Sequence, residues 1–111
     1  MIGNHDEENE AVLALPWAEP PVQQILIHVK GKPVFLNHYP MRSWPRVTKG
    51  GVQIHGHMHG RIPESAAQAD VGVDCRDFRP VRLAELERAM RASAPRPARD
   101  SPAPAGRARP R

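Results

Sequence analysis

Cysteine and aromatic residues are scarce in this sequence, and long apolar runs are missing from it. A single cysteine among 111 residues can form no disulfide within the chain, which favours a reducing, cytoplasmic environment. Aromatic residues make up 5% of the chain, so aliphatic side chains must fill most of a small core. No apolar run approaches the roughly 20 residues of a membrane-spanning helix. The acidic N-terminus, MIGNHDEENE, lacks the basic start of a secretory signal, so we expect a cytoplasmic protein without membrane contact.

The net charge of +4 comes entirely from the C-terminal end of the chain. Residues 1–92 contain 11 basic and 11 acidic side chains, whereas residues 93–111 contain five arginines and one aspartate. That end also holds five prolines and five alanines and no other apolar residue, so burial cannot offset the entropy of ordering it. We predict a folded domain over residues 1–92 and a disordered tail over residues 93–111. A basic tail can contact nucleic acid weakly through charge, although without aromatic residues to stack on bases a solvated extension is favoured.

Short β-rich segments and turns make up most of the predicted domain. Strands are predicted over three segments: residues 25–29, 33–37 and 52–55. The first two flank Lys30-Gly31-Lys32, which predicts a β-hairpin with a glycine-bearing turn. Apolar residues at helical spacing predict a helix over residues 83–91, and a shorter helix is expected over residues 10–15, ended by Pro16. The other predicted features are loops over residues 40–51 and 61–69, a strand over 71–74, a candidate strand over 80–82, and turns at Asp74 and Asp77.

Three of the six histidines fall at alternate positions in the segment IHGHMHG. The third predicted strand ends in this segment, and Gly56 is expected to allow a sharp turn that sends His57 and His59 to neighbouring points. Imidazole is a common ligand of borderline divalent metals. His55 precedes the turn and is expected to lie behind such a site.

Polar residues also follow two other apolar segments. His38 comes directly after the predicted hairpin in LNHYP, and Gly3-Asn4-His5-Asp6 comes directly after Ile2. Side chains at strand ends are where sites are usually built on a rigid sheet. An asparagine carbonyl oxygen is a neutral ligand for a metal. The order GNHD, NHYP and GHMH is therefore a specific pattern.

This pattern resembles the calcineurin-like metallophosphoesterases, whose last three signature motifs are Gly-Asn-His-Asp/Glu, a lone His and Gly-His-x-His. The resemblance covers residues 1–92 and leaves the tail unmatched. It implies an α/β fold, here the C-terminal half of a four-layer α/β/β/α sandwich, with the site at one end of the sheets. It also implies two metal ions and a hydrolase that cleaves a phosphate-ester substrate.

The resemblance implies a role for each matching residue. Four residues would be metal ligands, three on one ion and the last on the other: Asn4, His38, His57 and His59. His5 would act in catalysis by assisting the leaving group, and Asp6 would orient and charge-tune His5. These ligand types suit Mn, Fe, Zn or Ni on softness alone, and manganese is the first metal to try.

Two signature motifs of the family, Asp-x-His and Gly-Asp-x-x-Asp, do not occur in this sequence. In the family these two motifs supply the carboxylate that bridges the two metal ions and most ligands of the ion that His59 would bind, so this sequence lacks those ligands. We therefore expect this chain to hold at most one divalent metal ion well. Because Met1 and Ile2 alone precede the GNHD motif, we also expect the sequence to be the C-terminal half of a longer protein.

Three functions stay open at this point. The first is a metal-dependent phosphoesterase, represented here by an incomplete domain. The second is a catalytically inactive remnant that binds one metal ion, and the third is a nucleic-acid-associated protein that acts through residues 93–111. The sequence leaves open the substrate (a monoester, a diester or a nucleotide) and the oligomeric state.

Overall fold

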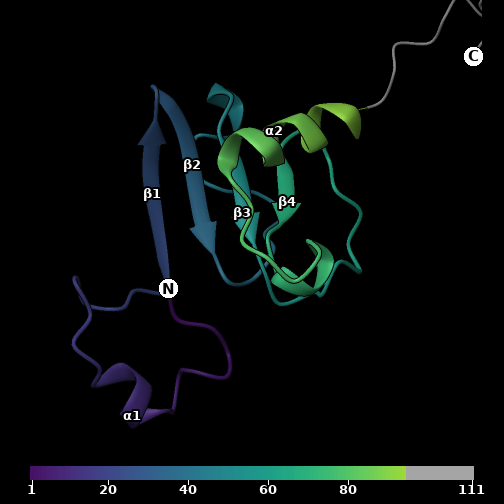
Figure 1. Cartoon of the computed structure of the whole chain (residues 1–111). Helices are drawn as coiled ribbons and strands as arrows, with labels where there is room; N and C mark the ends of the chain where they lie inside the picture. Colours follow the sequence, from purple (N-terminus) through teal and green to yellow (C-terminus); the bar gives the residue numbers. More distant parts are fainter. Residues whose placement is uncertain (95–111) are drawn as a thin grey trace, which may run out of the picture.

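A four-stranded mixed sheet forms the centre of the structure, with one helix packed on it (Figure 1). The computed structural model of the chain describes residues 1–94. Its elements are α1 (Glu10–Leu13), β1 (Gln24–Val29), β2 (Lys32–Asn37), β3 (Val52–His55), β4 (Gln68–Asp70) and α2 (Leu83–Ala92), with 3₁₀ turns η1 (Val47–Lys49) and η2 (Val73–Cys75). The predicted α/β class is confirmed. No helix within these described residues has the length and apolar character needed to cross a membrane.

The strands lie across the sheet in sequence order. β1 and β2 form an antiparallel hairpin, whereas β3 and β4 each run parallel to the preceding strand. The hairpin turn consists of Lys30 and Gly31, both at positive φ, which matches the right-handed twist of the flanking strands. Because β2, β3 and β4 run in the same direction, their C-terminal ends meet at one end of the sheet. Residues that follow these strands are therefore brought together.

Aliphatic residues on one face of the sheet pack against α2 and form the core. Six buried residues make up this cluster: Val34, Val52, Ile54, Ala69, Leu86 and Met90. Leu86 and Met90 are four positions apart on α2, so they lie on the same side of the helix, and each is only 1% exposed. Full burial of such side chains contributes about 1.5–3 kcal/mol each. These two residues therefore fix α2 to the sheet.

Two amide side chains, the buried Gln53 and the half-buried Gln68, anchor the loop between β2 and β3 to the opposite face of the sheet. The Gln53 side chain, which is fully buried, accepts from the Met41 N–H at 3.0 Å and donates to the Tyr39 carbonyl at 2.9 Å. The amide of Gln68 donates to the Met41 carbonyl at 2.7 Å. A buried polar group must keep its hydrogen-bond partners, so the segment that supplies those partners is held in one position. The two glutamines thereby fix the loop that starts with His38.

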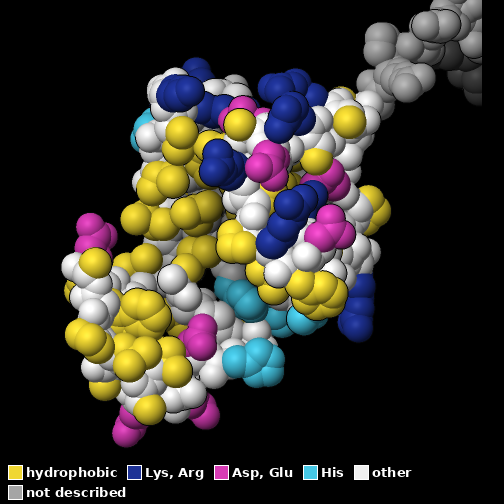
Figure 2. Space-filling model, in the orientation of Figure 1, with side chains coloured by type: hydrophobic (Ala, Val, Ile, Leu, Met, Phe, Trp, Pro, Cys, Tyr) yellow, Lys and Arg dark blue, Asp and Glu magenta, His cyan; other side chains and the backbone are white. Residues whose placement is uncertain are grey.

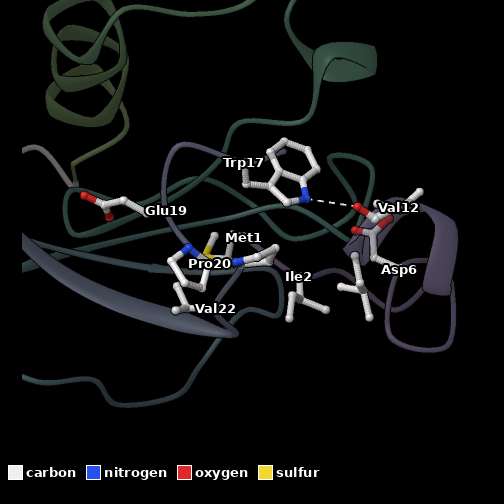
Figure 3. A pocket seen from close by; sticks show the side chains of 10 residues that line it. Met1, Ile2, Asp6, Val12, Trp17, Glu19, Pro20 and Val22 are labelled. Atoms are coloured by element: carbon white, nitrogen blue, oxygen red, sulfur yellow. Dashed lines mark hydrogen bonds between the residues drawn. The ribbon is translucent and has the colours of Figure 1, made fainter. Parts of the chain in front are cut away.

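The segment before β1 folds around α1 and lies beyond one end of the sheet (Figure 1). The Ile2 N–H donates to the Val22 carbonyl at 2.8 Å, and the indole N–H of Trp17 donates to the Val12 carbonyl at 2.9 Å. Figure 3 shows the hollow of about 300 Å³ that these side chains line. Asp6 also lines this hollow, but no predicted metal ligand does. The segment's contribution to the candidate site is therefore its first turn, at the GNHD motif.

Most predicted elements are confirmed. The hairpin, the strand over residues 52–55 and the helix over 83–91 agree with β1, β2, β3 and α2 to within one residue at each end. The helix over residues 10–15 is confirmed as α1, which ends at Leu13, before Pro16. The predicted disordered tail lies, from residue 95 onward, outside the described residues, so it stays a prediction.

The strand predicted over residues 71–74 is wrong. The fourth strand is β4, which begins three residues earlier, with two of its three residues inside the loop predicted over 61–69, and part of the predicted segment forms η2 instead. Among the residues of β4 only Ala69 packs in the core, so the sequence shows no apolar alternation there. Val73, by contrast, is apolar but 49% exposed. Residues 80–82 do not form a strand either.

Candidate metal centre

Three of the predicted metal ligands come together at the end of the sheet where β2 and β3 finish. The Oδ1 atom of Asn4 lies 2.7 Å from Nε2 of His38 and 3.2 Å from Nδ1 of His57. The centres of the two imidazole rings are 5.1 Å apart, edge to face. All three residues line a cleft of about 790 Å³, which His5 and His59 also line. Figure 2 shows histidines gathered between the N-terminal segment and the sheet.

The parallel pairing of β2 with β3 brings His38 and His57 together. The N–H of Gly56 donates to the carbonyl of His38 at 3.0 Å, which extends the contact between the two strands beyond their ends. Tyr39 packs on both histidines, with ring centres 5.1 Å from His38 and 4.8 Å from His57. This contact restricts how the two imidazole rings can rotate. Tyr39 is thus part of the site, although the sequence motifs assign it no role there.

A glycine allows the N-terminal turn to approach His38 closely. Gly3 is buried, and a Cβ atom at this position would lie only 3.0 Å from Nδ1 of His38. The Gly3 N–H donates to the carboxylate of Asp6 at 2.9 Å, and the Asp6 N–H donates to the Gly3 carbonyl at 3.0 Å. These two bonds close a tight turn. The turn holds the amide of Asn4 against the histidines.

Burial lowers the pKa of His38 below its ordinary value of 6.5, and the neighbouring His57 lowers this pKa further. The carboxylate of Asp6 acts in the opposite direction but is the weaker influence. The His38 ring is therefore held in its neutral form at neutral pH. Neutral imidazole is the form that binds metal ions.

The distances from Oδ1 of Asn4 to the two imidazole nitrogens can be compared with those between ligands of one metal ion. Atoms at about 2.1 Å from one metal ion lie about 3.0–3.4 Å from each other in octahedral or tetrahedral geometry. The separations of 2.7 and 3.2 Å around Oδ1 of Asn4 are close to that range. Within residues 1–94, no three side chains of the His, Cys, Asp and Glu types form a metal-binding group, so the set depends on the Asn4 amide. One amide oxygen and two imidazole nitrogens suit Mn, Fe, Zn or Ni.

His59 lies apart from these three ligands and contacts a carboxylate. Its Nδ1 atom makes a short contact with Oδ2 of Asp74 in η2, and both side chains are partly exposed to solvent. Both residues line the same cleft as His57. The assignment of His59 to a second metal ion stays a prediction, and the structure adds Asp74 as its partner.

The turn after β3 is not made by Gly56, which corrects the prediction. Gly56 is not among the residues with positive φ, whereas His57 and His59 have φ values of 67° and 52°. The left-handed region costs a non-glycine residue about 1–3 kcal/mol and is typical of functional sites. The contacts that His57 makes with Asn4 and Tyr39 hold it in this conformation.

The two predicted catalytic residues differ in their surroundings. His5 is exposed and lines the cleft next to the converging ligands. The carboxylate of Asp6 binds the N–H of Gly3, and the structure shows no hydrogen bond between Asp6 and His5 among the described residues. Asp6 therefore acts on the turn, and its orienting role toward His5 stays a prediction.

Two buried polar residues, His55 and Asp70, support the loops around the cleft. Nδ1–H of His55 donates to the Gly56 carbonyl at 2.8 Å, and the Asp70 carboxylate accepts from the N–H groups of Gly60 at 3.1 Å and Gly72 at 2.8 Å. Burial alone would raise the pKa of Asp70, but these two N–H groups and His55 outweigh it, so the pKa is lowered below 3.8. Sequence reasoning missed Asp70, although an aspartate two residues before a glycine is a turn signal.

Comparisons of this chain with protein-family models, with curated proteins and with solved structures give no match. The likeness to the metallophosphoesterases therefore rests on the three sequence motifs and on the convergence of their side chains.

Proposed function

We propose that this chain takes part in metal-dependent hydrolysis of a phosphate ester, and that Asn4, His38 and His57 hold one divalent metal ion. The observation that carries the proposal is the convergence of one amide oxygen and two imidazole nitrogens from three segments far apart in sequence. The order of these segments matches three motifs of the calcineurin-like phosphoesterases. In this proposal the sheet and α2 are half of the four-layer sandwich of that family.

The chain's own residues would position the reactants. A metal ion, when bound, supplies Lewis acidity toward a phosphoryl oxygen and makes water easier to ionise. Tyr39 and the Gly56 N–H keep the two ligand histidines in place. His5, which lines the same cleft, would carry a proton to the departing oxygen of the ester.

A second candidate function is metal binding without turnover. His59 contacts Asp74 instead of joining the other ligands, and the sequence contains neither Asp-x-His nor Gly-Asp-x-x-Asp. The ligand set of Asn4, His38 and His57 is neutral, so no protein charge in it offsets the charge of a dication. These observations favour one weakly held ion over a pair.

Metal binding by the whole chain tests the feature that both candidates share. We expect isothermal titration of residues 1–111 with MnCl₂ or ZnCl₂ to show one ion per chain. Asn4→Ala or His57→Ala should weaken this binding at least about tenfold, as loss of a ligand does. His28→Ala is the matched control, because His28 is exposed on β1 outside the cleft. Equal binding by wild type and His57→Ala would refute the site.

Hydrolysis separates the two candidates. We expect the chain with excess MnCl₂ to release nitrophenolate from bis(p-nitrophenyl) phosphate faster than the metal salt alone. His57→Ala and His5→Ala should each remove this activity, and only His57→Ala should also weaken metal binding. A chain that binds the metal but does not hydrolyse the ester has the second function.

A further inference from the structure

The outer edge of β1 is unpaired and unprotected. Within the described residues β1 pairs with β2 alone. Edge strands usually carry charged residues or proline that discourage further pairing, and the six residues of β1, QILIHV, include neither. Figure 1 shows β1 as the outermost strand, with α2 lying near β3 and β4. This edge is therefore open to another strand.

Pro33 identifies which backbone groups of β1 point outward. His28 lies opposite Pro33 in the hairpin. Pro33 has no N–H, so this pair cannot exchange the two hydrogen bonds of a hydrogen-bonded pair. The N–H and C=O groups of His28 therefore point away from β2. Because an antiparallel ladder alternates, the backbone groups of Leu26 and Gln24 point outward as well.

Aliphatic side chains border this open edge. Ile25, Ile27 and Val29 alternate along β1 on the face of the sheet that carries α2, and Ile25 is 38% exposed. Ile27 and Val29 also line a groove of about 500 Å³ together with Leu36 and Leu83. Figure 2 shows hydrophobic side chains gathered over β1 and β2. A contiguous apolar surface of this kind marks an interaction site.

We propose that β1 pairs antiparallel with β1 of a second copy of this chain, about a twofold axis at Ile27. In this register Ile27 faces Ile27 of the second copy, and Ile25 faces Val29 of the second copy. The aliphatic face of β1 has branched residues on both sides of Ile27, so it is complementary to itself. The pairing does not involve the metal ligands and is independent of the proposed hydrolysis.

The outward-facing backbone groups agree with this register. Leu26 lies opposite His28 of the second copy, and both have the free N–H and C=O groups that a ladder needs. Gln24 lies opposite Lys30 of the second copy, so no like charges meet. A register centred on Leu26 would instead place Gln23 opposite Val29, so the face that carries α2 would have two aliphatic pairs in place of three. Twofold pairing uses the β1 edge of both copies, so the assembly stops at a dimer.

The mass of the chain in solution tests the pairing. Light scattering after size exclusion should give twice the 12.3 kDa of one chain, with dissociation on dilution. Ile25→Lys places a charge in the apolar contact and should weaken the dimer at least tenfold. Phe78→Ser is the control, because Phe78 is 81% exposed and lies outside β1. Circular dichroism of each variant verifies that the sheet is folded.

Cysteine cross-linking tests the register even if Ile25→Lys is poorly folded. In a Cys75→Ser background, Ile27→Cys should form a disulfide between two chains, because facing Cα atoms in such a pair are about 4.5 Å apart. His28→Cys should not, because its Cα atoms are about 8 Å apart in this register. A monomer at every concentration, a dimer indifferent to Ile25→Lys, or a cross-link at Leu26→Cys in place of Ile27→Cys would overturn the proposal.

Discussion

Nε2 of His38 lies 2.7 Å from Oδ1 of Asn4, although 34 positions separate the two residues in sequence. An amide oxygen only accepts hydrogen bonds, so this contact requires a proton on Nε2 of His38. Nδ1 of His57 shares the same acceptor. A metal ion needs the lone pairs of these nitrogens, so each ring must move its proton to the other nitrogen on binding. In the proposed function the three ligands thus lie close together before a metal ion binds, and binding would exchange two hydrogen bonds for three metal bonds.

Gly3→Ala should weaken metal binding through His38. The new Cβ atom would lie 3.0 Å from Nδ1 of His38, closer than such atoms normally approach. The ring or the N-terminal turn must move, and overpacking of this kind costs about 1–3 kcal/mol. Titration calorimetry with MnCl₂ should show at least a tenfold loss of affinity. Gly56→Ala is the control, because its Cβ would lie 3.6 Å from the same atom, and it should bind nearly as wild type.

The protonation of His38 should depend on His57. Burial and then His57 lower the pKa of His38, so NMR titration of the metal-free chain should place this pKa below 6.5. In His57→Ala this pKa should rise, because the second-largest cause of its lowering is removed while burial remains the largest. The unfolded chain binds the proton more readily, so this contribution to stability is complete above pH 6.5 and declines as the pH falls through the folded pKa. A pKa of His38 at or above 6.5 in the wild type would contradict this account.

The sheet and most of the candidate site could be predicted from local sequence patterns. Two β-rich segments around Gly31 predicted the hairpin. The alternation of apolar and polar residues over 52–55 is typical of the strand found as β3. The parallel order of β2 and β3 then makes the meeting of His38 and His57 a consequence of topology. Asn4 joined them by motif order alone, because no local pattern shows that the first turn of the chain reaches the end of the sheet.

What the sequence patterns missed depends on side-chain contacts between distant residues. β4 was misplaced because two of its three residues, the half-buried Gln68 and the buried Asp70, are polar. Their side chains are paired with the Met41 carbonyl and with the Gly60 and Gly72 N–H groups. A sequence pattern of alternating apolar and polar residues reflects hydrophobic burial only, so it cannot reveal polar residues that are buried through such hydrogen bonds. The pairing of His59 with Asp74 is equally invisible, because it depends on how η2 folds back toward the cleft.

Gln53→Leu should destabilise the chain and loosen the loop that carries His38. Leucine has a similar size but leaves the Met41 N–H and the Tyr39 carbonyl without their partner. Each buried group left unpaired costs about 1–3 kcal/mol. Urea unfolding should show a loss in this range or above it, together with weaker metal binding. Gln23→Leu, an exposed change outside the sheet, should leave both measurements unchanged; a stable Gln53→Leu would mean that the loop is held by other contacts.

Asp70→Asn should lower the free energy of unfolding at neutral pH, and the loss should shrink in acid. The carboxylate of Asp70 accepts from both Gly60 and Gly72, whereas an amide offers one oxygen and turns an NH₂ group toward the other donor. Hydrogen bonds to a charged group contribute about 1.5–3 kcal/mol. Because the pKa of Asp70 is lowered below 3.8 in the fold, its contribution to stability is complete above pH 3.8 and is lost as the pH falls through the folded pKa.

Urea unfolding of wild type and Asp70→Asn from neutral pH down to about pH 3 measures this difference in stability. Asp77→Asn, at an exposed position whose positive φ asparagine also tolerates, should behave as wild type throughout. A constant deficit of Asp70→Asn across this range would show that shape, and not charge, makes Asp70 necessary.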